Sequence, residues 1–129
     1  LDRQDLGRAR AALERAGFVH RHTAGMDLFL DGPEAKARDA VHIVFAGERV
    51  RPDYDAPAPQ TGEAERVPGG LRVVGLEALV RMKLTSFRRK DQVHLLDLMD
   101  VGLLSEKSLA NLPPVLAARL KELLENPET

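Results

Sequence analysis

The chain has 129 residues, of which 43% are hydrophobic and 30% charged, and its formal net charge is -1. This size and composition predict one globular domain with its own core and exclude a disordered chain. The balanced charge argues against general nucleic-acid binding, and no apolar run is long enough to suggest a membrane span. The absence of cysteine excludes disulfides and fits a reducing compartment, so we expect a cytoplasmic protein.

The first third of the sequence predicts a helix followed by antiparallel strands. Asp2 and Asp5 are candidate N-caps, and Gly17 stands where a left-handed helix cap belongs. His20 and His22 alternate with other residues and should share the solvent face of a strand. The predicted elements are a helix at 5–16, strands at 18–23 and 26–30, a loop or helical turn at 33–39 and a central strand at 40–46.

The rest of the sequence predicts a loop and then helices. Residues 52–70 hold four of the eight prolines and three glycines, which is typical of a surface loop. The expected fold is therefore α+β: a small mixed or antiparallel sheet with an N-terminal helix and a C-terminal helical layer. We expect one domain over 1–129, made of a helix-and-sheet part at 1–51, the loop at 52–70, and a part at 71–129 with a strand at 71–74 and helices at 76–87, 91–100, 105–111 and 114–125.

A basic corner between two of these helices is the main functional candidate. Segment 81–90 holds five basic residues and no acidic one. Lys83 lies among apolar residues, so its stem would be covered and its ammonium would reach the surface. The cations at 88–90 would end one helix and Asp91 would begin the next, both in keeping with the helix dipole. An anionic ligand and a solvated helix junction both explain this pattern.

Other constellations carry weaker signals. Asp91, His94 and Asp97 are spaced i, i+3, i+6 and could hold a transition metal, although the spacing alone is unspecific. His42 is expected to be a hydrogen-bonded histidine of a strand rather than a catalytic base. The pair Gly69-Gly70 lacks the length and the following Lys-Ser/Thr of a phosphate-binding loop.

The run LEALVRMKLTSFRRKDQVHLLDLMDVGLL at 76–104 resembles the helical segment of bacterial nucleotidyltransferase-like proteins of the minimal nucleotidyltransferase superfamily, which includes toxin and antitoxin types. The opening run at 1–18 is similar to the helix that follows their first catalytic strand. The resemblance implies a nucleotide-binding corner in which Lys83, Arg88 and Lys90 face phosphates and Asp91 fixes their geometry. The family pattern falls on Leu79, Met82, Lys83, Arg88, Lys90, Asp91, Asp97 and Leu98.

Departures from this family are as informative as the matches. Its Gly-Ser turn and Asp-x-Asp signature, which hold two Mg²⁺ ions on a nucleoside triphosphate, are absent and would fall just before Leu1. A third family carboxylate would fall in 41–43, where His42 is no oxygen ligand for Mg²⁺, and Asp27 is the alternative. The chain as given is therefore not expected to catalyse two-metal nucleotidyl transfer.

Three functional hypotheses remain open at this point. The first is a truncated or degenerate nucleotidyltransferase-fold domain that keeps its nucleotide- or phosphate-binding corner. The second is a non-catalytic interaction module, the partner of a toxin or regulator, which would form a complex or a homodimer through an apolar face. The third is the C-terminal part of an active nucleotidyltransferase that uses Mg²⁺ and a nucleoside triphosphate, since the sequence begins at Leu1 rather than at methionine.

Overall fold

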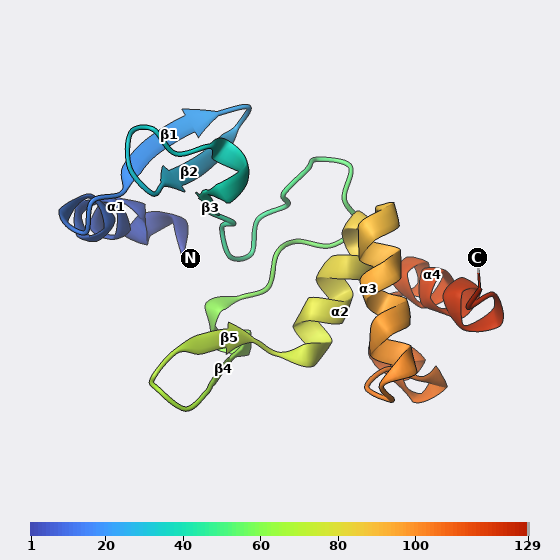
Figure 1. Cartoon of the computed structure of the whole chain (residues 1–129). Helices are drawn as coiled ribbons and strands as arrows, with labels where there is room; N and C mark the ends of the chain where they lie inside the picture. Colours follow the sequence, from blue (N-terminus) through green and yellow to red (C-terminus); the bar gives the residue numbers. More distant parts are fainter. Residues whose placement is uncertain (129) are drawn as a thin grey trace.

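The computed structural model describes residues 1–128 and shows an α+β fold (Figure 1). A helix and a three-stranded antiparallel sheet form an N-terminal part, which a long connection joins to a β-hairpin and a group of helices. The α+β class is confirmed, but the expected single sheet is two separate antiparallel sheets. The elements are η1 (Arg3–Asp5), α1 (Leu6–Arg15), β1 (Val19–Thr23), β2 (Met26–Leu30), η2 (Ala37–Asp39), β3 (Val41–His42), η3 (Thr61–Glu63), β4 (Ala64–Arg66), β5 (Arg72–Val74), α2 (Leu76–Ser86), α3 (Arg89–Asp100), η4 (Glu106–Asn111) and α4 (Pro114–Glu125), where η denotes a 3-10 turn.

The N-terminal part follows its local sequence signals closely. Gly17 ends α1 with a φ of +95°, as its position predicts. Ala24 and Gly25 both have positive φ, 50° and 76°, which is the type I′ geometry that joins β1 and β2 into a tight hairpin. Asp2 and Asp5 occupy the N-cap positions of η1 and α1, as predicted, but neither side chain makes a capping hydrogen bond.

The prediction of a central strand at 40–46 is wrong. Strand β3 holds two residues at the edge of a sheet with the order β1-β2-β3, and Val41 is 48% exposed. The centre is β2, in which Phe29 and both its neighbours are buried. Beyond β3 the chain leaves the sheet, and the N–H of Ala46 donates to the C=O of Leu1 at 2.8 Å. An apolar run shows that a segment is buried or paired, but it does not reveal how many strands flank it.

The second sheet is a hairpin of β4 and β5. The expected loop at 52–70 is irregular at first, but its second half contains η3 and β4. The predicted strand at 71–74 exists as β5 and pairs with β4 rather than with the first sheet. Gly69 and Gly70, with φ of 96° and 82°, form the turn between them.

The helical part has the predicted order and its own apolar core. The helix expected at 105–111 is the 3-10 helix η4, with Ser105 as its N-cap, and Pro114 occupies the first turn of α4. None of the helices within 1–128 has both the length and the apolarity to cross a membrane. The buried core residues are Ala56, Val80, Leu84, Leu95, Leu104, Leu116, Leu120 and Leu123.

Candidate anion-binding cleft

A sharp corner between α2 and α3 positions the basic residues. Helix α2 ends at Phe87, which has the left-handed φ of 46°, and Arg88 is already the N-cap of α3. The expectation that residues 88–90 end the first helix is therefore wrong, because the chain turns before them. Arg89 and Lys90 are exposed in the first turn of α3, where the helix dipole disfavours cations.

Asp91, an acid in the first turn of α3, is the centre of the corner. Its side chain is 1% exposed, and its Oδ2 accepts hydrogen bonds from Ser86 Oγ at 2.7 Å and from the backbone N–H of Arg88 at 3.1 Å. Arg88 Nε donates to Oδ2 at 2.8 Å, and Lys83 Nζ to Oδ1 at 3.3 Å. Burial alone would raise the pKa of Asp91, but these hydrogen bonds together hold its pKa far below the usual range.

Lys83 reaches Asp91 from the preceding helix. Its Nζ also donates to Nδ1 of His94 at 2.8 Å, and its side chain is 23% exposed. The ammonium is thus held over α3 and still meets water, so it is neither a freely moving surface lysine nor a fully buried one. The alternative metal site at Asp91, His94 and Asp97 has no support, since residues 1–128 contain no group of three His, Asp or Glu that could hold a metal.

A cleft of about 280 Å³ opens beside this corner. One wall comes from the α2–α3 corner, and the other comes from the 50–58 loop together with two apolar residues of the N-terminal part. Three cations and one carboxylate line the cleft, and Lys90 is not among the lining residues. The lining residues are Met26, Val44, Val50, Arg51, Tyr54, Ala56, Pro57, Ala58, Met82, Lys83, Thr85, Ser86, Arg88 and Asp91.

Hydrogen bonds hold the loop wall of the cleft in place. The N–H of Tyr54 donates to the C=O of Arg51 at 3.1 Å, and Arg49 Nε donates to the C=O of Tyr54 at 2.8 Å. Arg119 of α4 pairs with Asp55 at 3.1 Å, which ties the same loop to the helical part. Sequence reasoning missed Arg51 and Tyr54 as cleft residues. The one available signal was that Tyr54 is the single tyrosine of the chain.

The positions considered for a third carboxylate lie outside the cleft lining. Asp27 is buried and bonds with His20 Nε2 at 2.8 Å and with His22 Nδ1 at 3.2 Å; the His20 hydrogen bond, opposed by burial, lowers the pKa of Asp27. His20 was expected on the solvent face, but its side chain is only 13% exposed, and its ring lies 5.1 Å from that of Phe29. His42 is exposed, and its Nε2 lies 3.2 Å from the C=O of Ala37.

The residues that line the cleft do not fit the Mg²⁺ ions that the resemblance implies. Magnesium requires several oxygen ligands, and the cleft supplies a single carboxylate that Lys83, Ser86 and Arg88 already bind. The arrangement suits an anion instead, because the cations of the cleft outnumber its acids. No protein-family model, curated protein or solved structure matches this chain. The resemblance to nucleotidyltransferases therefore stays a prediction.

Proposed function

We propose that the chain is a nucleotidyltransferase-type domain whose cleft binds the phosphate groups of a nucleotide without itself supplying the metal-binding catalytic residues. The observation that carries this proposal is the presence of Arg51, Lys83 and Arg88 in the lining of one cleft that contains a single carboxylate, Asp91. Lys83 and Arg88 both contact that carboxylate, whose single negative charge offsets only one of the three positive charges. The cleft therefore keeps an excess positive charge for an incoming anion.

The three cations suit different parts of a polyphosphate. Arg88 is 53% exposed, and its guanidinium can offer parallel N–H groups to phosphate oxygens. Lys83 is a point charge on the α2–α3 wall of the cleft, where His94 and Asp91 hold it. Arg51 lies on the opposite wall. A phosphate chain between the walls would contact all three, and its affinity would fall as salt screens these charges.

Tyr54 makes this proposal directly measurable. The chain contains one tyrosine and no tryptophan, so its intrinsic fluorescence reports from the cleft wall. Tripolyphosphate does not absorb at the excitation wavelength, and its titration at low salt should change this emission saturably. Replacement Lys83→Met keeps the apolar stem and should raise the Kd about tenfold, equivalent to about 1.4 kcal/mol.

The matched control is Lys90→Met, which removes an exposed cation from the same corner but outside the cleft lining. This variant should bind tripolyphosphate within about twofold of the parent chain, since its charge is largely screened. Equal losses in both variants would indicate non-specific attraction to the basic corner. Unchanged binding in Lys83→Met would refute the assignment of Lys83. A thermal-shift titration with ATP and Mg²⁺ then tests whether a nucleotide stabilises the fold as a ligand of the native state must.

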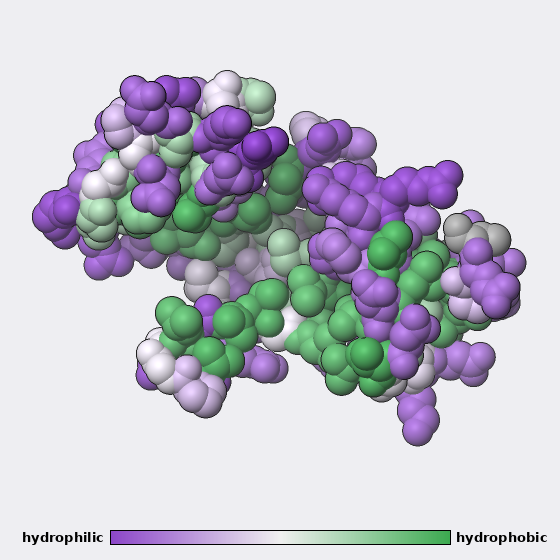
Figure 2. Space-filling model, in the orientation of Figure 1, coloured by the Kyte–Doolittle hydropathy of each residue, from purple (hydrophilic) through white to green (hydrophobic). Residues whose placement is uncertain are grey.

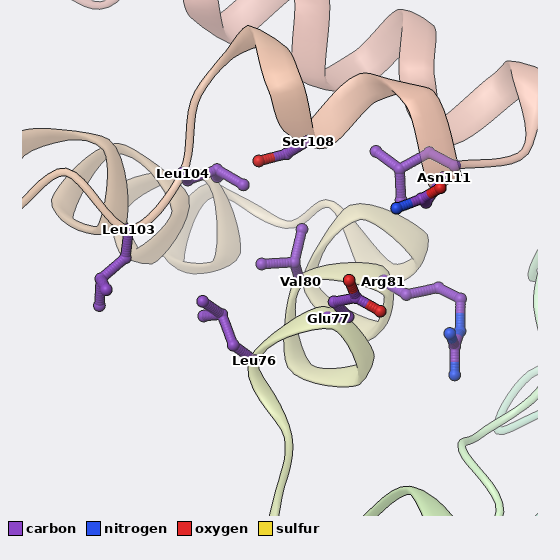
Figure 3. A pocket seen from close by; sticks show the side chains of 9 residues that line it. Leu76, Glu77, Val80, Arg81, Leu103, Leu104, Ser108 and Asn111 are labelled. Carbon is purple, nitrogen blue, oxygen red and sulfur yellow. The ribbon is translucent and has the colours of Figure 1, made fainter.

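An exposed apolar surface favours a second candidate function, that of a protein-interaction module. Apolar residues cover much of the visible face of the β4–β5 hairpin and of the neighbouring helices (Figure 2). Beside the hairpin, a pocket of about 220 Å³ lies between the start of α2 and η4, with Leu76, Val80 and Leu104 directed into it (Figure 3). This candidate predicts association without any nucleotide, which sedimentation of the ligand-free protein would detect.

A further inference from the structure

No strand within residues 1–128 pairs with either outer edge of the β4–β5 hairpin. The hydrogen-bond register of the hairpin shows which backbone groups lie on these edges. The N–H of Val67 donates to the C=O of Leu71, and the N–H of Gly75 donates to the C=O of Glu63. Hydrogen-bonded pairs alternate along an antiparallel ladder, so Glu65 and Val73 also form one. The backbone groups of Ala64 and Arg66 therefore point outward on the β4 edge, and those of Arg72 and Val74 on the β5 edge.

A two-stranded hairpin is marginally stable in water and needs further cover. This one exposes apolar side chains along β5: Leu71 is 68% exposed and Val73 43%, and both lie on the same face because side chains alternate along a strand. Leu76, which follows β5, is 37% exposed and lines the apolar pocket of Figure 3. An exposed edge of this kind is a template for pairing with another strand.

The charges on the two edges favour symmetric pairing of two copies through the β5 edge and disfavour it through the β4 edge. Symmetric antiparallel pairing of two copies through β4 opposes Glu65 to another glutamate or Arg66 to another Arg66, depending on register. On the β5 edge, pairing centred on Val73 sets Val73 against Val73 and Arg72 against Val74, with no like charges directly opposite. The Arg72 guanidinium is moreover drawn aside, since it donates to the C=O of Thr61 at 2.9 Å.

The same register brings a protruding side chain to the mouth of a pocket. Leu71 of one copy falls opposite Gly75 of the other, a residue without a side chain that immediately precedes Leu76. The pocket beyond Leu76 holds about 220 Å³ and is walled by Val80, Leu104 and Leu112. A two-fold axis repeats this contact, which is the self-complementarity that a symmetric dimer requires.

We propose that a second copy of this chain is the partner of the β5 edge, so that two hairpins form one four-stranded antiparallel sheet in the order β4-β5-β5-β4. The dimer buries the exposed faces of Leu71 and Val73 and pairs the outward backbone groups of Arg72 and Val74. It does not depend on the phosphate-binding cleft, in which no residue of β4 or β5 takes part.

A single cysteine tests the register directly, because the parent chain contains none. Pairing centred on Val73 places the two Val73 residues in a non-hydrogen-bonded site with Cα atoms about 4.5 Å apart, within the range of a disulfide. Mild oxidation of Val73→Cys should give a covalent dimer far faster than oxidation of Val93→Cys, whose parent valine is 54% exposed on α3. Equal rates for the two variants would overturn the proposal.

Sedimentation equilibrium of the cysteine-free chain gives the second measurement. The mass should rise from 14.2 kDa towards twice that value as the concentration increases. Val74→Pro removes an outward N–H and should abolish dimerisation, whereas Arg66→Pro makes the same change on the β4 edge and should not. A protein that stays monomeric up to about 200 μM, a range in which specific dimers form, would refute the interface, as would a dimer that Val74→Pro leaves intact. Far-UV circular dichroism of each variant checks that the fold is retained.

Discussion

The buried carboxylate of Asp91 offers the sharpest test of how the corner is built. Asp91→Asn keeps the shape of the side chain but removes its charge and one of its two acceptor oxygens. The oxygen Oδ2 accepts hydrogen bonds from Ser86, from the backbone of Arg88 and from the guanidinium of Arg88. An amide cannot serve all of these donors together with Lys83. We therefore expect this variant to be less stable.

The expected loss follows from the separate contacts. The hydrogen bond to the N–H of Arg88 caps the start of α3 and contributes about 1 kcal/mol. The Ser86 hydroxyl bonded to a charged acceptor contributes about 1.5 kcal/mol. Lys83 and Arg88 both reach water, so their ion pairs with Asp91 together add under about 1 kcal/mol. Because asparagine keeps one acceptor oxygen, Asp91→Asn should cost about 2 kcal/mol of unfolding free energy, and Asp91→Ala about 3 kcal/mol.

Urea unfolding followed by circular dichroism measures this loss, and its pH dependence identifies the cause. The folded-state pKa of Asp91 lies below its unfolded value of about 3.9, so its stabilisation is complete at neutral pH. The stabilisation should fade as the pH drops below about 4, and the parent chain should approach Asp91→Asn in stability there. Asp97→Asn, an exposed substitution on the same helix, should change stability by under about 0.5 kcal/mol. A loss below about 0.5 kcal/mol for Asp91→Asn, or one independent of pH, would refute the reasoning.

Two further predictions concern other buried interactions. Asp27→Asn should cost about 1 to 2 kcal/mol of unfolding free energy at neutral pH, because the buried carboxylate bonds with His20. Since the pKa of Asp27 is lowered, the difference between the variant and the parent chain should fade below about pH 4. Denaturant titrations from pH 3 to 7 measure this difference, and a constant value would contradict the prediction. Arg119→Lys should cost about 1 kcal/mol and several degrees in Tm, because lysine lacks the fork that reaches both Asp55 and the C-terminal carbonyls of α2. Lys121→Met is the matched control, because it breaks an exposed ion pair on the same helix. An equal change in Tm for the two variants would refute this explanation.

Sequence signals predicted the local structure well where a single residue decides the backbone. Gly17 adopts the left-handed conformation expected of it, and a tight turn joins the two strands predicted at 18–23 and 26–30. The helices predicted at 76–87, 91–100 and 114–125 correspond to α2, α3 and α4, because a helix with one buried face carries apolar residues at helical spacing. The role of β3 could not be predicted, since an apolar run carries no information about its neighbours. Strand β4 could not be predicted either, because it lies within a segment rich in proline and glycine, whose local sequence does not reveal its pairing with β5.

Only one wall of the candidate cleft, the α2–α3 corner, could be predicted from the sequence. Lys83, Arg88 and Asp91 lie within nine residues of one another, so local helical geometry brings them together. The opposite wall comes from the 50–58 loop, and only tertiary contacts such as the pair of Arg119 with Asp55 place it there. A sequence without periodicity gives no signal for such contacts. Arg51 and Tyr54 consequently looked like ordinary loop residues.

The corner itself depends on packing more than on local preference. Phe87 adopts a left-handed conformation that costs a residue other than glycine about 1 to 2 kcal/mol. Its ring packs against the helical core, and the Arg119 guanidinium lies 5.5 Å from the ring centroid. Glycine would relieve the backbone strain but would lose both contacts. Helix α4 therefore holds the turn that places Lys83 above Asp91, so the geometry of the proposed phosphate site is set by a helix that contributes no residue to it.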